Sequence, residues 1–450
     1  DQGLAYLAQA LTEAGYLTLA PNLNAAYANA YGATAENRTD LVEARSQQII
    51  DAHLAILSKA HQIGSADFGM PLTGKVNLNQ LATIGHSLGG GIAVGMARQS
   101  LEESAQFWGG DEISPVQALL LVSPTPSRSV EQEPWAYELP DVPTGIVVGG
   151  CDRDIHDLSS LYYFEAANAS ANRETPVAAL LVPGANHNFF NAAVLQDDYY
   201  RQPDNAPLCD PQQSTLRLSR VEQENFLVDY ALKFLEQTLN PGNHRGTRSG
   251  RGIPQSLIPS AQISQVMVLA NVAIPKAQQQ VRFSPAETAS NPLASGNLTL
   301  THCAAFQPCD ESLVRHPLFP TVLHIAWSQK GGWIRFPVSP QTVLQNAQSL
   351  HLRVAPVPGI SDSGTASRFA VVLKDQSGRA VRVEVPSSTP ALRELPADSA
   401  YPQSSLAYPS LVSIPIGQFR GVVLTRLAAV DLVFDEGSEG SIYLAEIRFL

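Results

Sequence analysis

The segment Ile84–Gly91, with the sequence Ile-Gly-His-Ser-Leu-Gly-Gly-Gly, constrains this chain more than any other part of it. An apolar run suited to a buried strand, Leu81–Ile84, precedes it, and a small-residue stretch suited to a helix, Gly91–Ala97, follows it. A serine within G-x-S-x-G at a sharp strand-to-helix turn is the pattern of a nucleophile elbow. The flanking glycines let the two backbones approach closely and hold the serine in a strained conformation. The segment predicts Ser87 as a nucleophile and the Leu88 N–H as an oxyanion donor.

A serine hydroxyl needs a base to take its proton, and two later segments carry suitable partners. Val177–Val182 is an apolar strand candidate, and the loop after it contains His187. Gly145–Gly150 is a second strand candidate and leads into a loop with Asp152 and Asp154. Functional groups gather at the carboxyl ends of strands in open α/β sheets. The order serine, aspartate, histidine is that of the α/β-hydrolase type and differs from the orders of the chymotrypsin and subtilisin types.

Asp152 and Asp154, both in the loop after Gly145–Gly150, are alternative candidates for the acid. Gly149 and Ile155 bracket Asp152 in the arrangement that many hydrolases of this type use, which favours Asp152 over Asp154. The register of a loop is not fixed by sequence, so Asp154 stays open as the alternative acid.

Two other histidines lie inside these motifs. His86, within the elbow, is expected to pack or to hydrogen-bond beside the site without acting as the base. His156 follows the two aspartates, and a surface histidine beside acidic residues is the expectation for it. His187 is therefore the predicted base.

Three blocks of the chain together resemble a known family: Gly85–Gly90, Gly150–Ile155 and Gly184–Asn191. They are similar to blocks of secreted bacterial α/β-hydrolases of the dienelactone-hydrolase, cutinase and polyester-hydrolase branch. The resemblance covers residues 1–240 and is specific for the fold and the triad but not for a substrate. It implies Ser87 as nucleophile, His187 as general base and then acid, and Asp152 as the group that orients the histidine.

The start of the chain departs from that family. Residues 1–11 predict a first helix with Leu4, Leu7 and Leu11 on one face, and Tyr16–Asn22 predicts the strand after it. In the family fold, earlier strands and a His-Gly loop with the second oxyanion donor precede this helix. An absent interior strand would leave two sheet edges unpaired. We therefore expect the N-terminal strands to be missing because the sequence is a truncated piece of a longer protein.

Composition excludes several classes of protein. The net charge of −12, with acidic residues scattered along the chain, argues against a nucleic-acid partner. No run approaches the roughly 18 apolar residues that a membrane span needs. The 450 residues suggest two to three domains, and 44% hydrophobic residues allow a sizeable core. The motifs require no cofactor and no metal, and the expected substrate is a small-molecule or polymeric ester.

The four cysteines predict disulfides in an oxidising compartment. Cys303 and Cys309 suit a small-loop bridge, and Cys151 and Cys209 suit a second one that ties the site loops together. Four cysteines allow three pairings, and the sequence does not choose among them. Four buried free thiols in a cytosolic protein are the alternative. We expect a secreted or periplasmic protein, with a signal peptide lying upstream of this chain.

Two domains and a linker are predicted. The α/β-hydrolase domain, a doubly wound and mostly parallel sheet, spans 1–240 and ends in a helix that starts with a capping box at Ser219. Residues 241–260, with a basic cluster, form a solvated linker. From 261 to 450, ten short β-patterned runs divided by Pro, Gly and Ser predict a β-sandwich or jelly roll as an accessory domain.

Two functional classes follow from these expectations. The first is a serine esterase that acts by acyl transfer through an acyl-enzyme. The second is a non-catalytic binding protein in which the hydrolase fold is a scaffold and the sandwich binds a carbohydrate or polymer surface. Trp327 and Trp333 suit stacking on a sugar ring, although tryptophans in strands are more often core. The intact serine, aspartate and histidine favour the enzyme.

Overall fold

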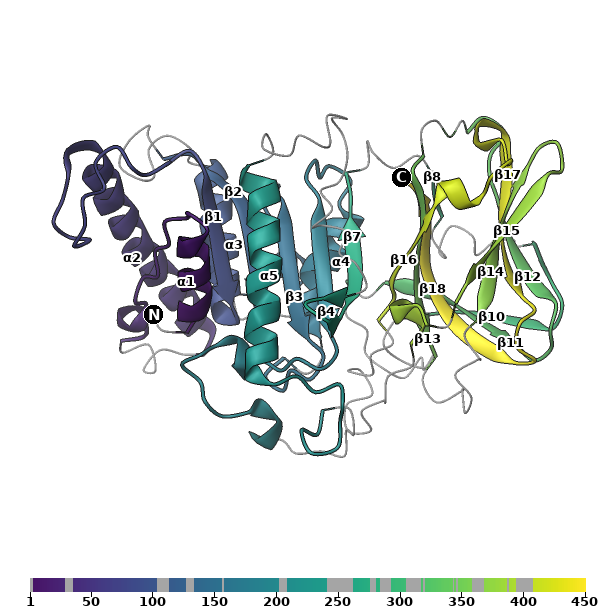
Figure 1. Cartoon of the computed structure of the whole chain (residues 1–450), viewed down its shortest axis with the longest axis horizontal. Coiled ribbons are helices and arrows are strands. Elements are labelled where there is room, and N and C mark those ends of the chain that lie inside the picture. The colour runs from purple at the N-terminus through teal and green to yellow at the C-terminus, as the bar shows by residue number, and fades with distance from the viewer. Residues whose placement is uncertain are drawn as a thin grey trace. The chain divides into compact units, whose positions relative to one another are not determined.

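The computed structural model describes residues 3–28, 35–102, 113–126, 133–155, 158–201, 209–240, 262–275, 281–283, 293–304, 317–318, 320–342, 344, 347–357, 368–386, 388–393 and 408–450. The chain forms two compact units (Figure 1). The first unit consists of Asp1–Pro203 with Arg217–Val266, and the second of Asp204–Leu216 with Met267–Leu450. The predicted linker, 241–260, lies outside the described residues.

A parallel sheet is the centre of the first unit. Its strands lie side by side in chain order: β1 (Leu81–His86), β2 (Val116–Val122), β3 (Thr144–Gly149) and β4 (Val177–Val182). Strands β2, β3 and β4 are nearly continuous runs of buried valine, leucine and isoleucine, as expected of parallel strands covered by helices on both faces. Parallel strands bring their carboxyl ends, and the loops that follow them, to one edge of the sheet.

The described residues of this unit include the α-helices α1 (Ala5–Glu13), α2 (Ala35–Ile63), α3 (Leu88–Glu102), α4 (Tyr162–Ala169) and α5 (Arg220–Leu239). In Figure 1, α5 crosses one face of the sheet with α1 beside it, and α3 covers the other face. Helix α5 starts with the predicted capping box, in which the Ser219 hydroxyl accepts from the Glu222 N–H and Glu222 accepts from the Ser219 N–H. Within the described residues, no helix has the length and apolar character that a membrane span requires.

One predicted strand of the first unit is wrong. Tyr16–Asn22 forms irregular chain after α1. Leu17 is 47% exposed, so the segment buries no continuous apolar face. Pro21 also lacks the N–H that a central strand would donate. The predicted first helix is confirmed as α1, with Leu7 and Leu11 buried.

The second unit is a β-sandwich of antiparallel sheets. One sheet has the order β10-β11-β18-β13-β16, with β8 on β18, and the other has the order β15-β14-β17-β12-β9. The strands of the unit are β7 (Leu269–Ala273), β8 (Val281–Phe283), β9 (Leu293–Ser295), β10 (Leu298–Ala304), β11 (Thr321–Trp327), β12 (Gly332–Pro337), β13 (Ser349–Pro356), β14 (Phe369–Asp375), β15 (Ala380–Val385), β16 (Ser410–Pro415), β17 (Leu427–Phe434) and β18 (Gly440–Phe449). A separate two-stranded sheet of β5 (Gln262–Ile263) and β6 (Val266–Met267) lies at the end of the first unit, which reaches Val266.

A common apolar core joins the two sheets of the sandwich. Alternate residues of each strand point inward, as in Ile334 and Phe336 of β12. Trp327 belongs to this core, because it is buried and stacks on Phe434 with the ring centroids 4.5 Å apart. Trp333 is half-buried on the outer face of β12, and the Arg335 guanidinium lies over its ring at 5.0 Å. The chain is thus mixed α/β, with a parallel sheet in one unit and a β-sandwich in the other.

Candidate active site

The turn between β1 and α3 holds Ser87 in a left-handed backbone conformation, with φ of 56°. A non-glycine residue rarely adopts this conformation unless its surroundings impose it. Three backbone hydrogen bonds impose it here. The Ser87 N–H donates to the Val122 carbonyl (3.0 Å), and the Ser87 carbonyl accepts from the N–H groups of Gly90 (2.8 Å) and Thr125 (3.2 Å). The turn is therefore tied both to its own helix and to the end of β2.

Close packing explains the glycines around the serine. A Cβ on Gly85 would collide with the backbone carbonyl of Gly89, so strand and helix approach each other without room for a side chain. A Cβ on Gly90 would lie 2.6 Å from Pro124 Cβ. Gly89 differs from both, since a Cβ there would meet nothing within 4 Å. The sequence thus uses glycine at two of these positions to make the turn sterically allowed.

The first turn of α3 presents an N–H beside the serine. Leu88 is the first residue of α3, and the first N–H groups of a helix have no acceptor within the helix. The helix dipole adds partial positive charge at this end. An oxyanion forming on a group attached to Ser87 would find this donor next to it.

The loop after β3 places Asp152 beside His187. Asp152 is 3% exposed, and its Oδ1 accepts the backbone N–H groups of Asp154 (3.0 Å) and Ile155 (2.7 Å). Its other oxygen, Oδ2, accepts from His187 Nδ1 at 2.7 Å. These bonds fix the carboxylate on both sides. Because Nδ1 is the donor, the lone pair of the neutral imidazole lies on Nε2.

Burial and charge act in opposite directions on this pair. Burial alone would lower the pKa of His187, but the charge and the hydrogen bond of Asp152, together with the charges of Asp154 and Asp198, outweigh it and raise the pKa of the imidazole above its ordinary value. Burial works to raise the pKa of Asp152, yet the charge and the hydrogen bond of His187 hold the pKa of this carboxyl below its ordinary value. The carboxylate of Asp152 therefore stabilises the protonated, positively charged form of the His187 ring.

Asp154 occupies a different side of the same ring. Its Oδ2 lies 3.8 Å from His187 Nε2, and its side chain is 31% exposed. The two aspartates that the sequence left open therefore face opposite nitrogens of one imidazole. Asp152 makes the short buried bond at Nδ1, whereas Asp154 lies on the Nε2 side.

His86 packs against the base, as the sequence predicts. The rings of His86 and His187 lie 4.6 Å apart, and His86 Nε2–H donates to the His187 carbonyl at 3.2 Å. Burial, followed by the neighbouring His187, lowers the pKa of His86 to about 3. His86 thus stays neutral at physiological pH. Its hydrogen bond holds the loop after β4 that carries His187, the base loop, next to the turn at Ser87. His156 lies outside the described residues.

Ser87 follows β1 and His187 follows β4, and the two side chains are not hydrogen-bonded to each other. Within the described structure, the Ser87 hydroxyl makes no hydrogen bond to His187. Catalytic hydrogen bonds are often long or poorly aligned before a substrate binds. His86 is covalently next to Ser87 and in ring contact with His187, so the serine and the imidazole belong to one cluster.

The base loop is supported from helix α5. Gln223, which is fully buried, accepts the Asn186 N–H (3.1 Å) and donates to the Asn186 carbonyl (2.7 Å). Asn186 in turn accepts the Phe189 N–H at 3.0 Å. The residues on both sides of His187 are therefore fixed by a helix that packs on the sheet.

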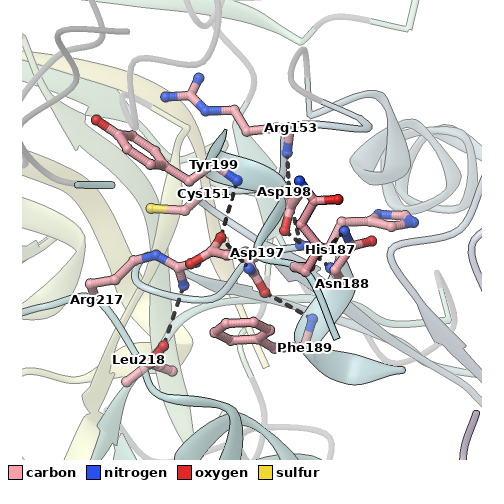
Figure 2. A network of polar contacts seen from close by, with 12 residues as sticks. Cys151, Arg153, His187, Asn188, Phe189, Asp197, Asp198, Tyr199, Arg217 and Leu218 are labelled. Carbon is pink, nitrogen blue, oxygen red and sulfur yellow. Dashed lines mark hydrogen bonds and ion pairs between the residues drawn. The ribbon is translucent and has the colours of Figure 1, made fainter. Parts of the chain in front are cut away.

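A second support, which the sequence analysis missed, comes from residues 197 and 198 at the start of the short helix η6 (Asp198–Arg201). Figure 2 shows both carboxylates beside the base loop. Asp197 accepts from Asn186 Nδ2 (2.8 Å) and from two contacts of Arg217 Nη2 (2.7 and 2.8 Å). The Arg217 guanidinium also lies over the Phe189 ring at 5.3 Å. Such contacts join residues that are far apart in the chain, so local sequence patterns do not reveal them.

The cysteines are bridged where the structure describes them. Cys151, Cys209 and Cys303 each form a disulfide, whereas Cys309 lies outside the described residues. The free-thiol alternative is wrong for these three, and Cys151, next to Asp152, is not available as a nucleophile. Among the described residues, no group of histidine, cysteine, aspartate and glutamate side chains fits a metal ion.

Comparison with known proteins gives neither a family nor a close relative. No protein-family model matches the chain. No curated protein sequence matches it either.

Several solved carbohydrate-binding modules resemble part of the chain. A β-1,3-glucan-binding module of family 6 from Bacillus halodurans has 16% identity and a TM-score of 0.21, and the match covers 38% of this chain and 96% of that one. A xylan-binding domain of family 22 has 12% identity, a TM-score of 0.24 and coverage of 39% and 96%. A family 11 module from Clostridium thermocellum has 8% identity, a TM-score of 0.23 and coverage of 36% and 87%. TM-scores at this level support no inference about what this chain binds.

Proposed function

We propose that this protein is a serine hydrolase that cleaves carboxylic esters through an acyl-enzyme. One observation carries the proposal: the buried 2.7 Å hydrogen bond from His187 Nδ1 to Asp152, in a cluster with a strained serine at a strand-to-helix turn. This bond fixes the imidazole tautomer with Nε2 as the base, which is the role of the acid in a catalytic triad. The neighbouring Leu88 N–H supplies the oxyanion donor.

The acylation step follows from these roles. The Ser87 Oγ–H proton passes to His187 Nε2 while Oγ forms a bond to the ester carbonyl carbon, and the carbonyl π electrons move to oxygen. The oxyanion accepts from the Leu88 N–H, and the new imidazolium is stabilised by Asp152. When the carbonyl reforms, the bond to the alcohol oxygen breaks, and His187 Nε2–H protonates that oxygen.

Deacylation repeats the sequence with water. His187 takes a proton from a water molecule as its oxygen attacks the acyl carbon, and the bond to Ser87 Oγ breaks. The proton returns to Oγ, and the carboxylic acid leaves. This chemistry uses no cofactor and no metal ion. We also propose that residues 1–240 form an α/β-hydrolase domain; the order of elbow, acid and base after strands β1, β3 and β4 of one parallel sheet supports this.

The proposal is tested by hydrolysis of a short-chain p-nitrophenyl ester. Ser87→Ala should lower kcat by about a million-fold, as loss of a triad serine does. Ser170→Ala, at the exposed C-terminal end of α4, is the matched control and should keep full activity. Equal rates for Ser87→Ala and the unchanged protein would overturn the proposal.

A second candidate function is polysaccharide binding by the sandwich. Trp333 favours it, since a half-buried indole on the outer face of a sheet suits stacking on a sugar ring. The probes are β-1,3-glucan and xylan. Loss of binding in Trp333→Ala, but not in Trp135→Ala, an exposed tryptophan of the first unit, would support it. Absence of binding by the unchanged protein would exclude these two polymers.

We propose a secreted or periplasmic location as well. Disulfide-bonded Cys151, Cys209 and Cys303 support it, because stable disulfides form mainly in oxidising compartments. Fractionation of the producing cells tests this, and recovery of the protein only from the reducing cytosol would contradict it.

A further inference from the structure

A buried carboxylate outside the triad connects the two loops that carry its acid and its base. Asp198 is fully buried. Its Oδ2 accepts the Arg153 N–H at 2.9 Å and the His187 N–H at 3.2 Å, and its Oδ1 accepts the Asn188 N–H at 3.2 Å (Figure 2).

These three donors lie on two separate loops. Arg153 follows Asp152 in the loop after β3, whereas His187 and Asn188 lie in the loop after β4. A buried backbone N–H needs an acceptor, and neither loop offers these donors one from a strand or a helix. Hydrogen bonds from N–H groups to a carboxylate are stronger than neutral ones. One side chain thus provides acceptors for N–H groups of both loops, and it adds to the direct bond from the Cys151 N–H to the Ala185 carbonyl (2.8 Å).

We propose that Asp198 is a positioning residue that clamps the acid loop to the base loop and thereby sets the Asp152–His187 distance. The structural claim, that Asp198 joins the two loops, depends only on the three hydrogen bonds. The kinetic claim, that Asp198 affects catalysis, rests on the proposed hydrolase function. Asp198 lies one residue from Asp197, but the two carboxylates act differently. Asp197 accepts from the side chains of Asn186 and Arg217, whereas Asp198 accepts from backbone N–H groups of both loops.

The clamp also has an electrostatic consequence. The described ionisable groups that face His187 are Asp152, Asp154, Asp198 and the ring of His86. The three carboxylates raise the pKa of His187 against the effect of burial. Burial, followed by the charge of Asp152, raises the pKa of Asp198, while its three backbone hydrogen bonds oppose this rise. Removing the charge at residue 198 should therefore lower the pKa of His187, an effect that a purely structural support would not have.

The test is Asp198→Asn. The amide has one acceptor oxygen, and its NH₂ group would face an N–H donor, so at least one of the three bonds is lost. We expect kcat for a p-nitrophenyl ester to fall by up to about 100-fold through misplacement of the base, with KM little changed. We also expect the pKa of His187, followed by NMR of the imidazole, to fall below that of the unchanged protein. An unchanged kcat together with an unchanged His187 pKa would overturn the proposal.

Asp141→Asn is the matched control. Asp141 also accepts backbone N–H groups, from Glu174 (2.9 Å) and Thr175 (2.9 Å), but it precedes β3 and therefore lies at the opposite end of the sheet. This variant should lower the melting temperature and leave both kcat and the pKa of His187 as they are. A change in the pKa of His187 of equal size in both variants would contradict a specific role for Asp198.

Two further results separate this inference from the proposed function. If no ester is hydrolysed by any form but Asp198→Asn still lowers the pKa of His187, the clamp stands and the hydrolase proposal fails. If Asp198→Asn does not fold, a pH titration of the protein without substitutions, followed by NMR, tests the clamp instead. The amide proton shifts of Arg153, His187 and Asn188 should then move together at one acidic midpoint, that of Asp198. Three amides that do not respond together would overturn the clamp.

Discussion

His187 carries an aspartate on each side of its ring: Asp152 Oδ2 lies 2.7 Å from Nδ1, and Asp154 Oδ2 lies 3.8 Å from Nε2. The first contact is buried and also held by two backbone N–H groups, whereas Asp154 is partly exposed. The two carboxylates therefore have different tasks in the proposed mechanism. Asp152 orients the base, and Asp154 lies on the side where the substrate enters.

We predict that Asp152→Asn lowers kcat for a short-chain ester by about 10,000-fold, because an amide at this position favours the wrong tautomer of the imidazole. Asp154→Asn should have a much smaller effect, since this residue does not bond to Nδ1. Steady-state kinetics of the two purified variants provide the comparison. A larger loss for Asp154→Asn would mean that the acid is assigned to the wrong aspartate.

The raised pKa of His187 predicts the pH dependence of activity. The base must be neutral to accept the serine proton, so kcat/KM should fall as the pH is lowered through the pKa of His187. Because that pKa is raised, the midpoint should lie above the ordinary histidine value of about 6.5. A pH–rate profile on an ester without ionisable groups measures it. A midpoint below the ordinary value would contradict the Asp152–His187 pairing.

The same shift predicts an opposite trend in stability. A group with a raised pKa in the folded protein stabilises the fold fully below its unfolded pKa and loses that contribution as the pH rises through its folded pKa. His187→Gln should therefore cost more unfolding free energy at about pH 6 than at about pH 9. Urea unfolding at both pH values tests this. A cost that is equal at both, or larger at high pH, would be the contrary result.

The elbow gives a steric prediction with an internal control. Gly85→Ala should destabilise the protein by about 1–3 kcal/mol, as overpacking does, because the new Cβ would collide with the Gly89 carbonyl. Gly89→Ala should be neutral or mildly stabilising, since this helical position is open and alanine favours the helix. Thermal melting of both variants decides the point. Similar losses would show that the strand and the helix do not approach as closely as described.

The sandwich gives a separate prediction about its tryptophans. Trp327→Ala should cost about 3–5 kcal/mol, because the ring is buried against Phe434. Trp333→Ala should cost clearly less, since its ring is half-exposed on the outer face. Chemical denaturation with tryptophan fluorescence would rank them. A greater loss for Trp333→Ala would place the core on the other side of β12.

Local signals predicted much of this fold. The strand Val177–Val182 and the capping box at Ser219 appear where the sequence indicates them, because a buried apolar run and a helix N-terminus are set by nearby residues. The sandwich strands followed from alternation of apolar and polar residues for the same reason. A strand of three residues, such as β9 (Leu293–Ser295), carries too little pattern to be predicted from the sequence. Tyr16–Asn22 was predicted as a strand because it is apolar, but pairing depends on the rest of the chain.

The candidate site was predictable in part. The turn at Ser87 and the order of Ser87, Asp152 and His187 along the chain could be predicted because each residue lies in a contiguous motif. The choice between Asp152 and Asp154 depends on how a loop folds back on itself, which a motif does not determine. Asp198 and Arg217 could not be found from the sequence. The bonds of Asp198 join residues 10 to 45 positions apart, and Arg217 and Asp197 lie 20 positions apart.

The most direct test of the central claim is covalent trapping of the nucleophile. A fluorophosphonate probe should form a single adduct on the unchanged protein, and peptide mass spectrometry should locate it on Ser87. Labelling should disappear in Ser87→Ala, persist in Ser170→Ala, and slow strongly in Asp152→Asn. An adduct on another residue, or labelling of Ser87→Ala at the rate of the unchanged protein, would contradict the account.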